Sequence, residues 1–493
     1  MKSNKIFGLI LAFALLVGAA GMLPSTASAG MVPLLVKGPL AGPALFPAGG
    51  GSPVYTCQTG QASWVCYDPF QIRHAYGVDQ LIAGRYAGQG RTIVIIDAYQ
   101  SPYLPDDLDA FDAAYGLPAR STGFFTQVAP DGLTAFDPND DDMVGWSEEI
   151  TLDVEWAHAI APGAHIVLVL SKSDDDTDIL SATQYAVDQN LGDVISQSFG
   201  GNESCDPATL VAEHTVFMNA TNKGMTIFAS TGDEGAAQPT CDYLSWTRAA
   251  SSPASDPLVT AVGGTELYAA NYCLALAGCN PATHLLPGTY QSEVGWNELD
   301  LVNLDPGGNI ASGGGYSLFF KKPPYQVGSG LVSGKRGVPD VSYNAAVNHG
   351  VLVFYDYSHF GGPWTFGGTS AGTPQWAAIT AIADQKAGHR LGFINGVLYG
   401  SEHSKSYLKT FHDIKMGSNT VIRLDASNNP VFVKGFNATP LWDADTGLGS
   451  PNAPIVVDLL VRYGTNYALS AFSALNPLES SNSTSGTGVM RPH

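Results

Sequence analysis

The sequence predicts an α/β fold with a mostly parallel central sheet and helices on both faces. Strand-like apolar runs and helix-like segments alternate repeatedly between residues 67 and 233, as they do in a parallel sheet covered on both sides. The chain has 493 residues, of which only 14% are charged, so it can bury a large core. One large domain with flanking segments fits this length.

The first expected elements surround a buried strand. RTIVIIDAY at 91–99 is an apolar run that ends in an acid, as parallel strands do. A helical entry over 68–82 precedes it. The next helix, at 106–117, is ended by Gly116, because glycine readily adopts the left-handed conformation that closes a helix.

The remaining elements repeat the alternation. They are a helix at 148–160, a strand at 161–171, a helix at 181–190, a strand at 192–200, a helix at 211–224 and a strand at 225–233. Ligands of such sheets bind at the carboxyl ends of the strands. Asp97, Phe199 and Asp233 lie at expected strand ends, so we expect them to converge on one crevice.

Residues 1–29 are expected to be a secretory signal peptide. Lys2 and Lys5 precede an apolar stretch, and Ala27–Ala29 forms an A-x-A cleavage site. A retained membrane anchor is the alternative, because the apolar run is nearly long enough to span a bilayer. Pro24 and the small residues after it favour cleavage, so we expect a secreted protein that has left the membrane.

Composition divides the rest of the chain into three parts. Residues 30–66 are rich in Gly and Pro and are expected to form a loose N-terminal segment. Residues 67–464 form the main domain, and the Ser/Thr-rich residues 465–493 are expected to be a flexible tail.

The charge balance argues against nucleic acid as a partner. Lys and Arg number 23 against 44 Asp and Glu, giving a net charge of −21, and no basic cluster offers a phosphate site. The acidity can serve solubility alone. Few basic residues also limit the positive charge that would unfold the protein in acid.

Six cysteines fit an exported protein with disulfides. They fall into three neighbouring couples: Cys57 with Cys66, Cys205 with Cys241, and Cys273 with Cys279. Six cysteines allow fifteen pairings, so the connectivity stays open. Metal binding by these cysteines or by paired histidines is not expected, because no CxxC or HxxxH spacing occurs.

Ser370 is the candidate nucleophile. It lies in GGTSAGTP at 367–374 and directly precedes an apolar helical run. Backbone N–H groups and the dipole at a helix N-terminus can stabilise an oxyanion. The alternative is a glycine-rich turn without chemistry.

Three acids are candidates for proton transfer. Glu149 and Asp153 lie one turn apart on a largely apolar helix, and such paired carboxylates split into one low and one high apparent pKa. Asp233 in ASTGDEGA can donate a hydrogen bond to an oxyanion when it is protonated. The plainer interpretations are a solvated helix face and a turn. A serine served by carboxylates predicts an enzyme that works in acid.

These motifs resemble the sedolisins, the serine-carboxyl peptidases related to the subtilisin fold. The resemblance extends from about residue 67 to residue 463 and rests on IVIIDAYQSPYLPDDLDAFDAAYGLP, EEITLDVEWAHAIAPGA, IFASTGDEG, VPDVSYNA and FGGTSAGTPQW. It implies that Ser370 is the nucleophile, Glu149 the general base, Asp153 the acid that orients Glu149, and Asp233 the oxyanion donor. It also implies that Asp97 extends the proton network.

An ordinary subtilisin is not expected. That family's histidine motif is missing, and the only His-Gly is at His349. His158 is read as a helix residue.

The resemblance also implies one calcium site near the C-terminus. Its expected ligands are Asp413, Ile414 through its carbonyl, and Asp443, and the family's two glycine carbonyl positions fall on Thr439 and Leu441. The alternative is that the two acids only cap turns.

Two departures from the family are visible. Relatives usually carry a folded propeptide, whereas only 30–66 separates the expected signal from the domain, so we expect folding without an inhibitory prodomain. Phe199 stands where some relatives have Trp, so no indole N–H joins the proton network there.

The sequence therefore predicts a secreted, acid-acting serine-carboxyl endopeptidase that hydrolyses proteins or peptides through an acyl-enzyme, as a monomer. A tripeptidyl aminopeptidase of the same family and a non-catalytic exported binding protein on the same fold are the alternatives. No motif selects a subsite preference.

Overall fold

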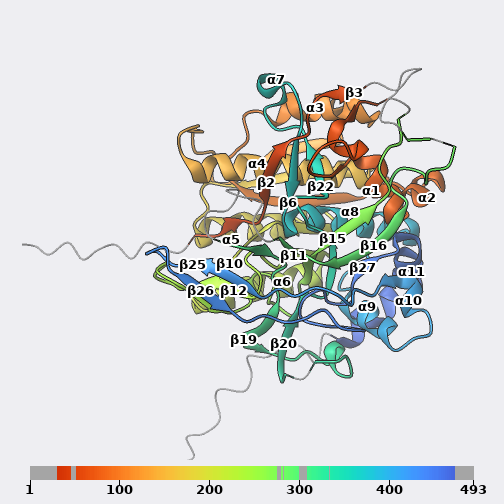
Figure 1. Ribbon diagram of the computed structural model, residues 1–493. Helices are drawn as coiled ribbons and strands as arrows, with labels where there is room; N and C mark the ends of the chain where they lie inside the picture. Colours follow the sequence, from red (N-terminus) through yellow and green to blue (C-terminus); the bar gives the residue numbers. More distant parts are fainter. Residues whose placement is uncertain are drawn as a thin grey trace, which may run out of the picture.

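The computed structural model describes residues 30–45, 52–274, 279–280, 282–298, 308–331 and 333–471 (Figure 1). The expected signal peptide at 1–29 and residues 472–493 of the expected tail lie outside the described residues.

An eight-stranded sheet forms the centre of the molecule (Figure 1). Its strands are β6 (Thr92–Ala98), β7 (Phe125–Val128), β8 (His165–Ser171), β9 (Val194–Gln197), β11 (Thr226–Ser230), β15 (Thr260–Ala269), β16 (Tyr290–Gly295) and β21 (Val341–Asn344). The order is β16-β15-β11-β9-β6-β8-β7, and β21 also pairs with β15. All pairs are parallel except β15 with β16. The predicted fold class is confirmed.

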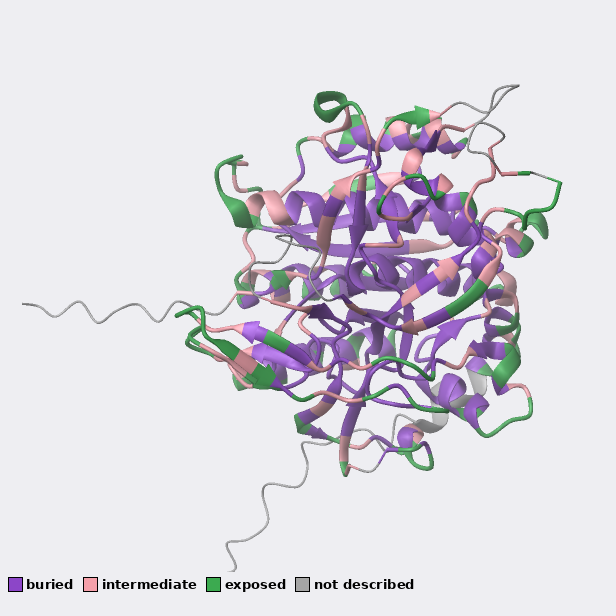
Figure 2. Cartoon of the chain, in the orientation of Figure 1, coloured by how far each residue is buried: buried purple, intermediate pink, exposed green. Residues whose placement is uncertain are grey.

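Helices cover both faces of this sheet. Successive side chains of a strand point to opposite faces. Ile93 and Ile95 of β6 therefore join a core with α3 (Leu104–Tyr115), α4 (Asp141–Ile160) and α8 (Thr369–Ala387). Val94 and Ile96 join a second core with α5 (Asp176–Asp188) and α6 (Pro207–Asn222). Figure 2 shows that the interior of both layers is buried.

The other elements surround these layers. The helices are α1 (Pro69–Ala75), α2 (Val78–Ala83), α7 (Tyr357–Phe360), α9 (Asn395–Glu402), α10 (Tyr407–Thr410) and α11 (Ala453–Ala471). The strands are β10 (Phe199–Asn202), β12 (Ala237–Pro239), β13 (Trp246–Arg248), β14 (Ser251–Ser252), β17 (Asn297–Glu298), β18 (Ile310–Ala311), β19 (Gly315–Lys321), β20 (Lys335–Val338), β22 (Gly350–Val353), β23 (Trp364–Gly367), β24 (Phe411–His412), β25 (Val421–Leu424), β26 (Pro430–Val433) and β27 (Ser450–Pro451).

The described parts of the segment 30–66, residues 30–45 and 52–66, form strands, whereas a loose segment was predicted. It contributes β1 (Val32–Pro33), β2 (Val36–Leu40), β3 (Ala44–Leu45), β4 (Val54–Tyr55) and, continuing to residue 67, β5 (Cys66–Tyr67). β1 pairs with β10 and β2 with β23, both antiparallel. These partners lie more than 150 residues away in the sequence, so local composition did not reveal the pairing.

Two helices extend beyond their expected limits. α4 begins seven residues before the predicted start, because the side chain of Asp140 caps it by accepting the N–H groups of Asp142 and Met143. α11 continues to Ala471 and so enters the expected tail.

The three neighbouring cysteine couples are disulfides. Cys57–Cys66, Cys205–Cys241 and Cys273–Cys279 are all bonded, so the couples suggested by proximity are confirmed. Among the described helices, none has the length and apolar character needed to cross a bilayer.

Candidate active site

Ser370 lies in the first turn of α8, directly after the strand β23. Gly368 is the N-cap of this helix and has a φ of 100°, a backbone conformation that residues other than glycine rarely adopt. A Cβ there would lie 2.5 Å from Asp233 Oδ2. This tight turn brings Ser370 Oγ to 3.0 Å from Glu149 Oε2, to which it donates a hydrogen bond, and to 3.1 Å from the carbonyl oxygen of Ser198.

Two acids of α4 lie in the protein interior next to Ser370. Glu149 and Asp153 are fully buried and lie one turn apart on the face that packs against α8. Ser198, between β9 and β10, donates its hydroxyl to Asp153 Oδ1 at 2.8 Å. Sequence reasoning missed Ser198, because nothing in its local pattern distinguishes it from any serine after a strand.

Burial raises the pKa values of the carboxyl groups near Ser370. Burial raises the pKa of Glu149 well above its usual range, the charges of Asp153 and Asp97 raise it further, and the bond from Ser370 opposes them. Burial also raises the pKa of Asp153, against the hydrogen bonds of Ser198 and Glu149. The pKa of Asp97, at the end of β6, is raised by burial and by Asp153. The pKa values of these three carboxyl groups therefore depend on one another, and the groups titrate together.

Asp233 follows β11 and faces the N-terminus of α8. Its Oδ1 accepts the backbone N–H of Thr369 at 2.8 Å and the Thr369 hydroxyl at 2.9 Å. Its charge also acts on Glu149. The predicted strand-end acids, Asp97 and Asp233, both lie near enough to Glu149 for their charges to raise its pKa. Phe199 begins β10 and packs on Trp146.

A further residue at this site comes from the N-terminal segment. The carbonyl oxygen of Leu34 accepts the backbone N–H of Ser370 at 3.0 Å, and the N–H of Leu34 donates to the carbonyl of Ser198 at 3.1 Å. Sequence reasoning missed this contact, since it treated residues 30–66 as loose.

His158 and His349 do not contact Ser370, Glu149, Asp153 or Asp233 in any hydrogen bond of the described residues. His158 is buried on α4, stacks on Phe124 with 3.8 Å between ring centroids, and contacts the carbonyl of Pro118 through Nε2. Burial lowers its pKa to about 4. His349 pairs with Glu266. Both are remote from the contacts of Ser370 recorded in the described chain.

The acids of the expected calcium site face one short turn. The N–H of Thr439 donates to Asp443 Oδ2 at 2.8 Å, and the N–H of Leu441 donates to Asp413 Oδ1 at 2.9 Å. Leu441 has φ 67 and so keeps a glycine-like backbone. Within the described residues, no N–H or O–H group donates to the carbonyls of Ile414, Thr439 or Leu441.

Two carboxylates and three carbonyls without a donor in the described residues are hard oxygen ligands of the kind that calcium prefers. The carboxylates already accept hydrogen bonds, Asp443 from the N–H groups of Thr439, Asp445 and Thr446, and Asp413 from the Tyr407 hydroxyl and the Leu441 N–H. The ammonium group of Lys415 lies 3.1 Å from Asp413 Oδ2, but this side chain is half exposed and can turn away.

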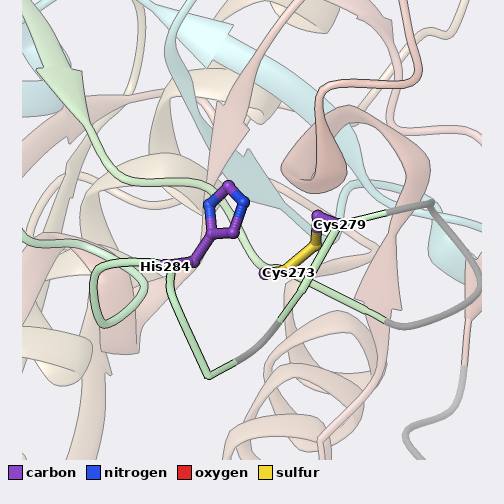
Figure 3. Close-up of side chains that lie close together, drawn as sticks. All are labelled: Cys273, Cys279 and His284. Carbon is purple, nitrogen blue, oxygen red and sulfur yellow. A yellow bond between two sulfur atoms is a disulfide. The ribbon is translucent and has the colours of Figure 1, made fainter.

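One cluster of sulfur and nitrogen atoms lies apart from these sites. His284 lies beside Cys273 and Cys279, as Figure 3 shows. The two sulfurs are joined in a disulfide, so they are not the thiolates that bind metals.

Comparison with known proteins agrees with this geometry. The model of the subtilase family matches residues 132–392, more than half of the chain. Kumamolisin from Bacillus sp. (strain MN-32) is 32% identical over 411 residues, which are 80% of this chain and 64% of kumamolisin. Sedolisin from Pseudomonas sp. (strain 101) is 32% identical over 70% of this chain and 53% of its own length.

A solved structure is also similar. Pseudomonas sedolisin, described as a serine-carboxyl proteinase in complex with pseudo-iodotyrostatin, aligns with a TM-score of 0.64 and 28% identity, over 82% of this chain and all of that chain. The chain spans between half and two thirds of the length of the two curated relatives.

A parallel sheet with a serine at the start of a buried helix, together with the family match, defines a class: the chain belongs to the subtilase family. Within that family it is a member of the sedolisins, as the two relatives and the structural neighbour show. The recognised family and the subtilisin-like fold are confirmed.

Proposed function

We propose that this protein is an acid-acting serine-carboxyl endopeptidase. The observation that carries the proposal is the 3.0 Å hydrogen bond from Ser370 Oγ to Glu149 Oε2 in a fully buried position. A serine hydroxyl needs an adjacent base to become a nucleophile. Among the recorded contacts of the described chain, only carboxyl groups supply one.

The mechanism follows from the contacts. Ser370 attacks the scissile carbonyl and passes its proton to Glu149, which Asp153 orients and Ser198 supports through Asp153. Glu149 then protonates the leaving amine, and water hydrolyses the acyl-enzyme by the reverse route. The N–H of Ser370 and a protonated Asp233 stabilise the oxyanion. Because a carboxylate cannot donate, loss of the Asp233 proton removes one donor, which predicts activity at low pH.

An endopeptidase is favoured over tripeptidyl release by the course of the N-terminal segment. The segment whose Leu34 carbonyl contacts Ser370 stays bound for more than three residues before that carbonyl. Its fourth residue, counted back from Leu34 as the first, is Met31, and the N–H of Met31 donates to the carbonyl of Asp174 at 2.9 Å. A tripeptidyl peptidase must instead recognise a free amino group three residues before the scissile bond. Proteins and peptides are thus the proposed substrates, and nucleic acid and membrane are not proposed as partners.

We infer secretion from three features taken together. These are the expected signal peptide at 1–29, the three disulfides and the acid-adapted site. The peptidase domain is assigned to 67–464, and a monomer is proposed.

One calcium ion is proposed to bind Asp413, Asp443 and the carbonyls of Ile414, Thr439 and Leu441. When bound, it would neutralise two adjacent acids and tie together the loops before β25 and β27. Its chemistry would be structural, because the site is distinct from the contacts of Ser370.

The activity is tested on denatured haemoglobin and casein from pH 2 to 7. We expect a maximum below pH 6, and loss of activity in Ser370→Ala and Glu149→Gln. The matched control is Glu155→Gln on the same helix, whose carboxylate accepts the N–H of Phe354 rather than facing Ser370. Activity that peaks above pH 6, or that survives in either site variant, contradicts the proposal. Product masses distinguish internal cuts from tripeptides.

A further inference from the structure

Four large apolar side chains are exposed near one another, on a hairpin and on the turn that it contacts. They are Tyr243, Leu244, Ile422 and Phe432, each between 47% and 65% exposed. Single exposed apolar residues are normal on protein surfaces, whereas a group of them marks a binding surface. We call these four residues the apolar rim.

Two residues of the apolar rim belong to a hairpin whose other face is buried. Ile422 of β25 and Phe432 of β26 are cross-strand partners, so their side chains lie side by side on one face. The neighbouring Val421 and Val433 point to the opposite face and are buried in a small core with Ala237. The hairpin is therefore anchored by one face and presents apolar side chains on the other.

The other two residues, Tyr243 and Leu244, lie in a turn with a fixed backbone. The disulfide Cys205–Cys241 ties this turn to the segment before α6. The carbonyl of Leu244 accepts the N–H of Ala426, in the connection between β25 and β26, at 3.1 Å. A backbone that is already fixed does not have to be ordered when a partner binds, which favours association.

The apolar rim borders a cavity of about 330 Å³. Tyr243 lines this cavity together with Trp246 and Leu424. Leu424 belongs to β25, and its carbonyl accepts the indole N–H of Trp246 at 2.7 Å. The hairpin and the turn thus form one wall of the cavity, and the exposed side chains of the rim lie on the solvent side of that wall.

The same cavity reaches the candidate active site. Gly200 lines it, two residues after Ser198, whose carbonyl contacts Ser370. Glu234 lines it as well and directly follows Asp233. The cavity therefore extends from the surroundings of Ser370 and Asp233 to the apolar rim.

β26 offers backbone groups in addition to apolar side chains. In the part of the chain that the structure describes, it pairs with β25 alone, so its outer edge has no strand partner. A free strand edge can bind an extended polypeptide through backbone N–H and C=O groups, whatever the sequence of that polypeptide. An unfolded protein offers such an extended segment, whereas a compact folded one does not.

We propose that the apolar rim and the free edge of β26 form a docking site for an unfolded protein substrate, outside the residues that flank the scissile bond. The inference rests on the proposed peptidase function. An apolar side chain of the substrate packs on Ile422 and Phe432, while the same chain runs along the cavity to Ser370. Because both contacts belong to one chain, the second binding step is intramolecular and adds affinity. Unfolded proteins are therefore bound more tightly than short peptides.

The test compares a long and a short substrate at pH 4. The long one is denatured casein, and the short one is an internally quenched peptide of about eight residues that contains one of the bonds cut in casein. In Ile422→Ser with Phe432→Ser, we expect KM for casein to rise about tenfold, because two apolar side chains lose their contact. The kcat for casein and the kcat/KM for the short peptide should stay within about twofold of the wild type.

The matched control is Leu285→Ser with Leu286→Ser. These two leucines are exposed like those of the rim, but they do not line the cavity. Both kinetic constants of this variant should equal those of the wild type on both substrates.

A second measurement needs only the wild type, so it holds if the hairpin variant does not fold. Quenched peptides share one cleavable centre and carry a Leu-Val-Phe extension behind Gly-Ser linkers of increasing length. We expect kcat/KM to rise about tenfold once the linker lets the extension reach the rim. A Ser-Gly-Ser extension should give no rise at any length.

The outcomes distinguish the two proposals. An unchanged KM for casein in the hairpin variant, or no rise with the apolar extension, overturns this inference and leaves the proposed function standing. An equal loss on casein and on the short peptide also overturns it, because the short peptide does not reach the rim. If the wild type hydrolyses neither substrate, both the inference and the proposed function fail.

Discussion

Removal of the Ser198 hydroxyl should shift the pH at which this protein becomes active. In Ser198→Ala, Asp153 loses a 2.8 Å hydrogen bond from a donor that, like Asp153, is fully buried. The carbonyl of Ser198, which contacts Ser370, is retained. The change therefore acts on the acids rather than on the nucleophile.

The magnitude follows from the charge on the acceptor. A hydrogen bond to a charged group contributes about 1.5–3 kcal/mol, and a neutral carboxyl group also accepts one, so roughly half of this value separates the two protonation states. One pKa unit corresponds to about 1.4 kcal/mol. The bond favours the ionised form, so its loss raises the apparent pKa of the Glu149–Asp153 pair by about one unit.

The assay is kcat/KM for an internally quenched peptide between pH 2 and 6. The base must be ionised, so the acidic limb of the profile should move about one unit towards neutral pH, and activity below that limb should fall by about tenfold. The plateau should change little. The control is Ser196→Ala in β9, where the buried hydroxyl makes no hydrogen bond recorded in the described residues. An unmoved limb, or an equal loss at every pH, would refute the reasoning.

Three further predictions concern stability. Burial raises the pKa of Glu213 to about 8, so the pKa of this group is higher in the folded protein than in the unfolded chain. The contribution of the protonated carboxyl group to the free energy of unfolding is therefore complete below about pH 4 and is lost as the pH rises towards 8. The melting temperature should therefore fall across that range, with a smaller fall in Glu213→Gln; an equal fall in both proteins would contradict this. Replacing Cys205 and Cys241 together by Ser opens a loop of 36 residues and should cost about 4 kcal/mol by the chain-entropy relation, measured by urea unfolding; a change below 1 kcal/mol would contradict it. Calcium at about 100 times its Kd should stabilise the wild type by about 2.7 kcal/mol relative to EDTA, and Asp443→Asn should abolish this gain. The control Asp425→Asn, in an exposed turn, should keep the gain, and the absence of any gain in the wild type would show that the site does not bind calcium.

The central sheet was readable from the sequence because its strands are continuous apolar runs. β6 and β8 are buried on both faces, and this leaves a local signal that needs no partner. Glu149 and Asp153 were readable for the same reason, since acids within an apolar helix are conspicuous.

The parts that were missed depend on partners distant in sequence. β1 and β2 are short strands in a segment rich in Gly and Pro, and their edges are satisfied only by β10 and β23. The role of Ser198 depends on its hydrogen bond to Asp153, which lies 45 residues away in the sequence. Local composition indicates which secondary structure a segment prefers. The contact between Leu34 and Ser370 joins two distant segments, so it depends on the fold of the whole chain.

The path of residues 30–40 bears on how this protein can be handled in the laboratory. An affinity tag fused ahead of Gly30 would be joined directly to the residues that pair with β10 and contact Ser370. Such a tag would therefore enter or leave the molecule beside the candidate active site. A tag at the other end of the chain would not be joined to this segment, so it is the better choice for activity measurements.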